Sequence, residues 1–188
     1  MTDAAPRLET ERLILRMFRE DDFETYYAKI GADADVMRYL GDGQPLTRSL
    51  AWRQMAMIVG HWQLRGYGMW AVEERSTGEL VGRIGLFNPE GWPGFELGWV
   101  LARAYWKRGY ATEGARRVLD HAFTDMGRDH VISLIYPDNA ASIRVAERIG
   151  ETLEGRVDLF GHETLVYGIE RARYRQCFTY TTSPSTST

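Results

Sequence analysis

The sequence has a single cysteine, Cys177, among 188 residues, which excludes an intrachain disulfide and a cysteine-rich metal site. No apolar run approaches the roughly 18 residues that a membrane-spanning helix needs. Residues 1–6 have neither the basic nor the apolar region of a secretory signal peptide. We therefore expect a cytoplasmic protein with no membrane partner.

Positive charge is also scarce, because 23 Lys and Arg residues stand against 26 Asp and Glu residues, for a formal net charge of −3 at pH 7. This balance, with no basic stretch that interleaves aromatic residues, argues against nucleic-acid binding. His61, His121 and His130 fall at no metal-ligand spacing, so no metal site is predicted. The hydrophobic content of 44% is sufficient for the core of one domain.

One stretch, residues 95–123, predicts a strand that turns directly into a helix. Residues 95–101 are rich in aromatic and β-branched residues, which is typical of a strand. A helix is predicted to begin near Gly109, because apolar side chains then recur with the spacing of one buried helical face. These residues are Ala111, Ala115, Val118, Leu119, Ala122, Phe123 and Met126.

The turn before this helix has the chemistry of an anion site. Gly109 allows a sharp turn, and the unpaired N–H groups of a helix N-terminus attract negative charge. Lys107 and Arg108 add full positive charges beside it. We interpret the turn as a phosphate or diphosphate site, with a solvated basic turn as the competing interpretation. Neither the P-loop pattern nor the G-x-G-x-x-G dinucleotide pattern occurs.

The same stretch resembles the acyl-CoA-binding motif of the GNAT superfamily of N-acetyltransferases, and most closely the branch of the RimJ/RimL ribosomal-protein acetyltransferases. In the superfamily pattern Q/R-x-x-G-x-G/A, Trp106 stands at the first position, and Gly109 and Ala111 stand at the other two. Lys107 occupies a position where members of this branch often have glycine. The segments that carry the likeness are Glu96-Leu97-Gly98-Trp99-Val100 and Tyr105 to Glu113, with further likeness in residues 8–16, 82–86 and 137–150.

The resemblance implies an α/β (α+β) fold of the GNAT acyl-CoA N-acyltransferase type, with a central mixed, mostly antiparallel sheet of six or seven strands flanked by helices. One domain is expected over residues 8–177, with disordered tails at 1–7 and 178–188. From residue patterns, the strands are expected at 12–18, 67–73, 80–87, 95–101, 130–136, 154–160 and 162–174. The helices are expected at 21–30, 36–40, 47–65, from 109 and at 139–149.

The resemblance also implies acetyl-CoA as cofactor. Backbone amides from Arg108 to Thr112 would hold its diphosphate, with Lys107 or Arg108 near the phosphates. The strand end at Trp99, Val100 and Leu101 would pair with the pantetheine arm, and an N–H near Val100 or Leu101 would polarise the thioester carbonyl. The full set of expected cofactor-binding residues is Trp99, Val100, Leu101, Lys107, Arg108, Gly109, Tyr110, Ala111, Thr112, Asn139 and Ser142.

Glu96 is the candidate general base, with a solvated strand-end carboxylate as the alternative. Ser142 is the candidate group beside the leaving thiolate, as in the branch, and Tyr136 is the second choice. Asn139 can cap its helix, contact the cofactor, or do both. The mechanism is expected to be direct attack of the amine, since no cysteine lies near the site to form a covalent intermediate.

The amine acceptor is expected to be a protein N-terminus. An α-amine with a pKa of about 7.7–8.0 is partly neutral at pH 7, whereas a lysine amine near about 10.4 needs a stronger base. A small-molecule amine (polyamine, aminoglycoside or amino-acid derivative) and a non-catalytic acyl-CoA-binding module are the alternatives. The acceptor, the acyl length and the choice of monomer or homodimer stay open. Loop residues that could attract a cationic amine are Asp33, Asp35, Asp42, Asp158, His162 and Glu163.

Overall fold

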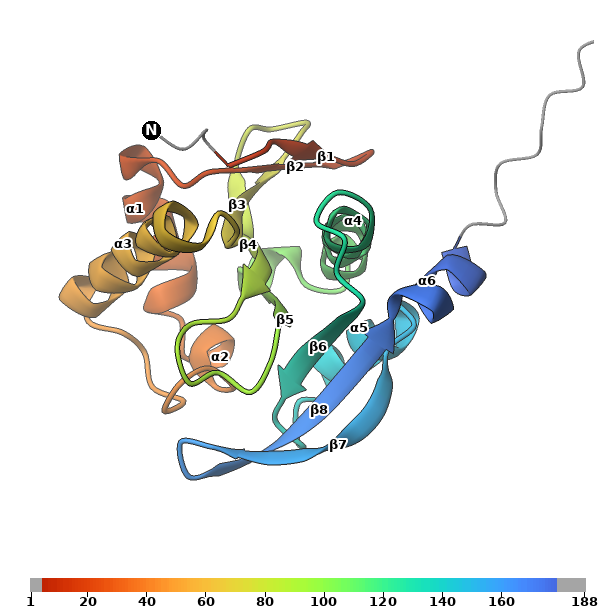
Figure 1. The fold of residues 1–188 in the computed structure, drawn as a ribbon. Helices are drawn as coiled ribbons and strands as arrows, with labels where there is room; N and C mark the ends of the chain where they lie inside the picture. The colour runs from red at the N-terminus through yellow and green to blue at the C-terminus, as the bar shows by residue number, and fades with distance from the viewer. Residues whose placement is uncertain (1–4, 179–188) are drawn as a thin grey trace, which may run out of the picture.

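The computed structural model describes residues 5–178; residues 1–4 and 179–188, which hold most of the two tails predicted to be disordered, lie outside the described residues. Within the described range, eight strands form one sheet in the order β1-β2-β3-β4-β5-β6-β8-β7 (Figure 1). All neighbours pair antiparallel except β5 and β6, which run parallel. The strands are β1 (Leu8–Glu9), β2 (Leu13–Arg16), β3 (Met69–Glu74), β4 (Leu80–Phe87), β5 (Glu96–Leu101), β6 (His130–Ile135), β7 (Thr152–Leu159) and β8 (His162–Glu170).

The predicted fold class is confirmed, but the sheet has one strand more than the six or seven expected. The additional strand, β1, is two residues long and folds back on β2, with Leu8 opposite Leu15. A strand this short has no period that a sequence pattern can show.

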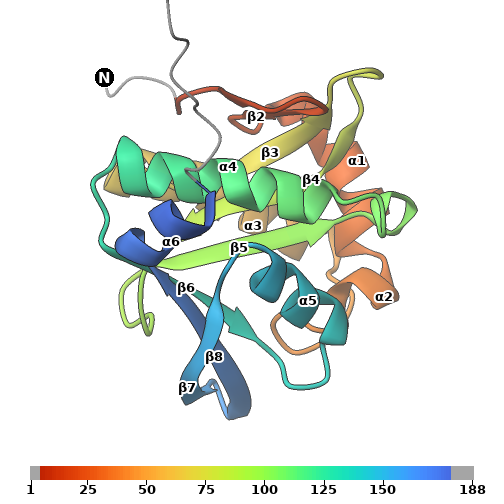
Figure 2. The same ribbon diagram turned by 90° about the vertical axis from the view of Figure 1, so that its right-hand side faces the viewer.

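Helices cover both faces of the sheet (Figure 2). One face carries α1 (Phe23–Tyr26), α2 (Ala34–Met37) and α3 (Arg48–Arg65), and the other carries α4 (Tyr110–Thr124), α5 (Ala140–Arg148) and α6 (Arg171–Phe178). Short 3₁₀ turns lie at Glu20–Asp22 and Arg103–Tyr105, and a π-helical turn lies at Tyr27–Gly31. Among the described helices, none has the length and apolar character needed to cross a membrane.

Two expected elements need correction. The helix expected over residues 21–30 is a 3₁₀ turn, a short α-helix and a π turn in succession. The last strand was expected to continue to Tyr174, but it ends at Glu170 and the chain becomes α6. Tyr174 and Phe178 pack their rings together on the helix, 5.1 Å apart, so their burial reflects helix packing and not strand alternation.

The ends of the two helices nearest the site follow from local chemistry. The Asn139 side chain accepts a hydrogen bond from the Ser142 N–H at 3.1 Å and so caps α5, while Gly109 begins α4 with a left-handed φ of 83°. The predicted apolar face of α4 is buried in the core, where Ala115, Val118 and Leu119 are fully covered. Gly114 lets α4 approach β4, because a Cβ at this position would lie 2.5 Å from Ile84 Cδ1.

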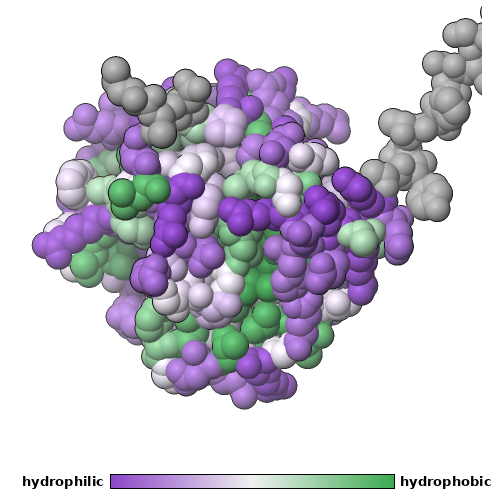
Figure 3. All heavy atoms as spheres, in the orientation of Figure 1, coloured by the Kyte–Doolittle hydropathy of each residue, from purple (hydrophilic) through white to green (hydrophobic). Residues whose placement is uncertain are grey.

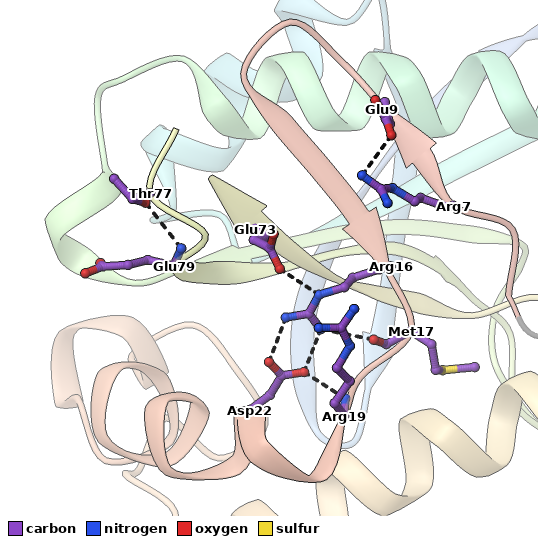
Figure 4. A network of polar contacts seen from close by, with 9 residues as sticks. All are labelled: Arg7, Glu9, Arg16, Met17, Arg19, Asp22, Glu73, Thr77 and Glu79. Atoms are coloured by element: carbon purple, nitrogen blue, oxygen red, sulfur yellow. Dashed lines mark hydrogen bonds and ion pairs between the residues drawn. The ribbon is translucent and has the colours of Figure 1, made fainter. Parts of the chain in front are cut away.

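A buried ion-pair network fixes β2 and β3 to the first helices (Figure 4). The Arg16 guanidinium donates two hydrogen bonds to the Asp22 carboxylate, at 2.7 and 2.8 Å, and one to Glu73 at 2.8 Å. Its side chain is 11% exposed, and these carboxylates raise the pKa of Arg16. Removing one partner would leave an uncompensated buried charge, so the network holds the helical layer in one position relative to the sheet.

Candidate functional site

A cavity of about 570 Å³ opens where β5 and β6 diverge. The two strands share one register pair, Glu96 opposite Ile132, whereas every other pair of long neighbouring strands runs together for several residues. The residues around the cavity come from α4 and α5 on one face of the sheet and from α2 and α3 on the other, so the opening connects the two faces. Figure 3 shows hydrophobic residues exposed in a strip over this part of the sheet, bordered by hydrophilic ones.

The backbone of β5 turns hydrogen-bonding groups to the gap. The Phe95 carbonyl accepts from the Ile132 N–H at 3.0 Å, and the Leu97 carbonyl accepts from the Ser133 hydroxyl at 2.9 Å. Because alternate residues of a strand direct their backbone groups to the same side, Trp99 and Leu101 face the gap beyond the end of the ladder. The N–H groups of Val100 and Leu101 were both expected as possible donors to the thioester. Val100 turns its backbone groups to β4, so only the Leu101 N–H faces the cavity.

The turn before α4 brings backbone amides to one end of the cavity. Tyr110, Ala111 and Thr112 form the first turn of α4 and line the cavity, together with Gly109 and Lys107. The expected N–H groups therefore converge at a site with the partial positive charge of a helix N-terminus.

Lys107 has a left-handed backbone with a φ of 62°, a conformation that favours glycine. The branch that the sequence resembles often has glycine at this position, and Lys107 adopts the backbone conformation that glycine favours. The Trp106 indole N–H donates to the Leu101 carbonyl at 2.7 Å and ties the turn to the strand end.

Arg108 is the one expected cofactor residue that does not line the cavity. Its guanidinium lies 5.2 Å from the centre of the Tyr105 ring and 3.8 Å from Glu74, while its carbonyl accepts from Arg12 at 2.9 Å. Of the two expected charged side chains, only Lys107 lines the cavity.

Glu96 lies at the floor of the cavity, and its surroundings differ from a solvated strand end. The Trp92 indole N–H donates to its carboxylate at 2.7 Å. Burial raises the pKa of Glu96 to about 7, against the opposing influence of the Trp92 hydrogen bond and the Arg83 charge. A carboxyl group with this pKa exchanges protons near neutral pH, which is the property required of a general base.

Ser142 and Asn139 line the cavity on the α5 side. The Trp99 indole N–H donates to the Ser142 hydroxyl oxygen at 3.3 Å, which leaves the hydroxyl proton available for another acceptor. The Tyr136 hydroxyl also reaches the cavity wall, but it donates to the Gly41 carbonyl at 2.9 Å.

The acidic loop residues form no continuous surface beside the cavity. Asp35 and Asp42 line it, and Asp35 pairs with Arg103 at 2.9 Å. The remaining candidates, Asp33, Asp158, His162 and Glu163, are not part of the lining. Within residues 5–178 no group of His, Cys, Asp and Glu side chains has the arrangement of a metal site.

Trp92 and Arg83 are among the lining residues that the sequence analysis did not identify. Nothing in the sequence of the loop around Trp92 indicates its hydrogen bond to Glu96. Arg83 is a charged residue in the otherwise apolar strand LVGRIGLF, and this exception to the strand pattern was the available signal.

Comparison with known proteins identifies the family. Residues 12–152 match the acetyltransferase (GNAT) domain. The protein YkkB of Bacillus subtilis is 34% identical over 179 residues, which cover 92% of this chain and 99% of YkkB. An acetyltransferase structure from Agrobacterium tumefaciens is similar with a TM-score of 0.76 and 33% identity, covering 90% of this chain and 97% of that one.

The fold is also shared with RimL, a ribosomal L7/L12 α-N-protein acetyltransferase whose structure contains coenzyme A. That likeness has a TM-score of 0.74 and 19% identity, and covers 88% of this chain and 98% of RimL. At this identity the likeness shows that the two proteins share a fold, and it does not assign this chain to the RimJ/RimL branch. Other relatives from Bacillus subtilis, YoaA and YnaD, are named N-acetyltransferases. The chain therefore belongs to the GNAT family of acetyltransferases and is an N-acetyltransferase.

Proposed function

We propose that this protein transfers an acetyl group from acetyl-CoA to the α-amine of a protein N-terminus, within a single domain spanning residues 8–177. The observation that carries the proposal is one cavity that joins the N-terminus of α4, the open edge of β5 and the carboxyl group of Glu96. GNAT proteins use acetyl-CoA, and the residues of this cavity fit that molecule.

The fit rests on three features of the site. The N–H groups of Tyr110, Ala111 and Thr112 form a cradle for a diphosphate, and Lys107 adds charge beside it. The backbone of Trp99 at the open edge of β5 can pair with an amide group of an extended pantetheine arm, and Leu101 leaves its N–H free for the thioester. Asn139 lines the opposite wall. When bound, acetyl-CoA would supply the acetyl group as a thioester.

Three groups of the chain would each assist one part of the acetyl transfer. The Leu101 N–H faces the gap and would donate a hydrogen bond to the carbonyl oxygen as negative charge develops there. Glu96 would accept the proton of the attacking amine through intervening water, because it and Leu101 lie at opposite ends of β5, roughly 16 Å apart. Ser142 would donate its free hydroxyl proton in a hydrogen bond to the leaving sulfur.

The acceptor follows from the strength of the base. A carboxylate with a pKa of about 7 is matched to an α-amine, whose conjugate acid has a pKa of about 7.7–8.0, better than to a lysine amine near about 10.4. An amino-acid derivative with a free α-amine is the second candidate, because Glu96 lines a cavity of about 570 Å³ that a small molecule can occupy.

Thiol release from acetyl-CoA tests the proposal with a set of matched amines. The set contains a peptide with a free N-terminus, the same peptide with a blocked N-terminus, a free amino acid and a polyamine. We expect release with the free peptide and none with its blocked form. Release with the polyamine alone would favour the small-molecule alternative, and binding of coenzyme A without transfer to any amine would favour a binding module.

A further inference from the structure

Arg83, on β4, lines the same cavity as Glu96. Arg83 lies on β4 opposite Val100, and Phe87 lies on the same strand opposite Glu96. Paired residues of neighbouring strands point to the same face, and so do residues four apart on one strand, so the two charged side chains lie on one face of the sheet. Both line the cavity. Phe87 stacks on His61 of α3 at 5.1 Å, so this is the face of the sheet that α3 covers, opposite to α4.

Arg83 is partly buried, and no hydrogen bond or ion pair links it to any residue between 5 and 178. Its Nε atom is fully buried without a partner. Arg16 and Arg103, in contrast, are paired with Asp22 and Asp35, and the Arg128 guanidinium lies over the Phe95 ring at 4.2 Å. A buried donor without a partner is costly, and a guanidinium is built to bind carboxylate or phosphate groups through two parallel hydrogen bonds.

The neighbouring charges do not provide that partner. Arg83 lowers the pKa of Glu96 through its charge, yet the two groups form no ion pair. Asp35 is already paired with Arg103, and Asp42 accepts a hydrogen bond from the Gln44 N–H at 3.1 Å. The free positive charge of Arg83 therefore faces the cavity, next to the group proposed to receive the amine proton.

We infer that the acceptor amine carries an anionic group, a carboxylate or a phosphate, which pairs with Arg83 while the amine lies at Glu96. This inference rests on the proposed function and specifies its substrate class. A free amino acid and a protein N-terminus that begins with an acidic residue both have this chemistry. A polyamine or an aminoglycoside lacks it and would place further positive charge beside Arg83.

The test compares kcat/KM for pairs of acceptors that differ in one anionic group. The pairs are an α-amino acid and its amide, a peptide beginning with Glu and the same peptide beginning with Gln, and O-phosphoserine amide and serine amide. We expect the anionic member of at least one pair to be preferred by about 10- to 100-fold, the range of a charge-assisted hydrogen bond. The pair that shows the preference identifies the source of the anion.

Arg83→Gln should reduce that preference to about one, and Arg83→Lys should retain part of it, because lysine keeps the charge and loses the two-pronged geometry. Arg53→Gln, which changes an exposed arginine on α3 outside the cavity, is the matched control and should keep the wild-type preference. Calorimetry of the N-acetylated anionic product in the presence of coenzyme A gives a readout independent of turnover, and the Arg83→Gln protein should bind this product more weakly.

Equal use of charged and neutral acceptors by the wild type would overturn the inference. So would an Arg83→Gln protein that loses activity equally towards both members of a pair. In either case the wild-type protein still transfers the acetyl group, so the proposed function stands and only the proposed anionic class of acceptor is wrong. No transfer to any amine would instead refute the proposed function.

Discussion

The role of Glu96 gives a prediction that can be worked out from the structure. Burial raises the pKa of this carboxyl group from its ordinary 4.5 to about 7, so a large fraction is protonated at neutral pH. If the ionised form is the general base, roughly one tenth of the enzyme is in the active form at pH 6 and roughly nine tenths at pH 8, and kcat/KM should follow this fraction. The wild-type profile should therefore show a break near pH 7, separate from the ionisation of the amine.

Glu96→Gln preserves the shape and the acceptor oxygen for the Trp92 N–H but cannot take up a proton. We expect kcat/KM to fall by about 10²- to 10⁴-fold, the usual contribution of general-base catalysis. The inflection near pH 7 in the profile of kcat/KM should disappear, and the inflection caused by ionisation of the acceptor amine should stay. Coenzyme A affinity should change little, because Glu96 lies on the acceptor side of the cavity.

The assay is initial-rate thiol release between pH 5.5 and 9 with two acceptors of different amine pKa. The break that does not move with the acceptor belongs to the enzyme. An unchanged break near pH 7 in the Glu96→Gln protein, or a rate loss below about tenfold, would refute the assignment of Glu96 as the base.

Three further changes test other parts of the site. Trp92→Phe removes the hydrogen bond that lowers the pKa of Glu96, so the break in the pH profile should move above 7, with activity at pH 7 reduced and largely regained at higher pH. Glu151 is buried, and burial raises its pKa to about 8, so the folded state holds a proton that the unfolded state releases above its ordinary 4.5. The stability from this group is thus full below pH 4.5 and is lost as the pH rises to about 8. Between about pH 5.5 and 8, wild-type stability relative to Glu151→Gln should fall by roughly 3 kcal/mol in denaturant titrations, whereas parallel curves would contradict the assignment. Lys107→Gly should raise the free energy of unfolding by about 1 kcal/mol by relieving the left-handed backbone, and should weaken acetyl-CoA binding in calorimetry; unchanged affinity would remove Lys107 from the cofactor site.

The elements around α4 could be predicted because their residues follow strong local patterns. The apolar spacing from Ala111 to Phe123, the glycine before it and the aromatic strand at 96–101 all agree on one structure. Asn139 was likewise identifiable as a cap from its position before α5. These features depend on the chain within a few residues, which is what a sequence shows directly.

The features that the sequence did not predict depend on tertiary contacts that no local pattern shows. The polar environment of Glu96 is made by Trp92 from the preceding loop and by Arg83 from another strand, and no local spacing reports either contact. The continuation of the chain as α6 depends on a surface offered by α4, where Phe123 packs against Tyr174 at 5.1 Å. Tertiary packing, and not the strand pattern, decides the conformation there.

The left-handed backbone of Lys107 is another feature that the sequence does not show. Its φ of 62° is imposed by a turn that is held at both ends, by Trp106 on the β5 side and by Gly109 at the start of α4. A lysine gives no sequence signal for that conformation.

The central claim is that the N-terminus of α4 holds the diphosphate of acetyl-CoA and directs its thioester to Glu96. A crystal structure of the protein with acetyl-CoA bound tests it most directly. We predict diphosphate oxygens at about 2.7–3.2 Å from the backbone nitrogens of Tyr110, Ala111 or Thr112, with the pantetheine arm along the open edge of β5. A cofactor bound away from Gly109, or none bound at saturating concentration, would contradict the account.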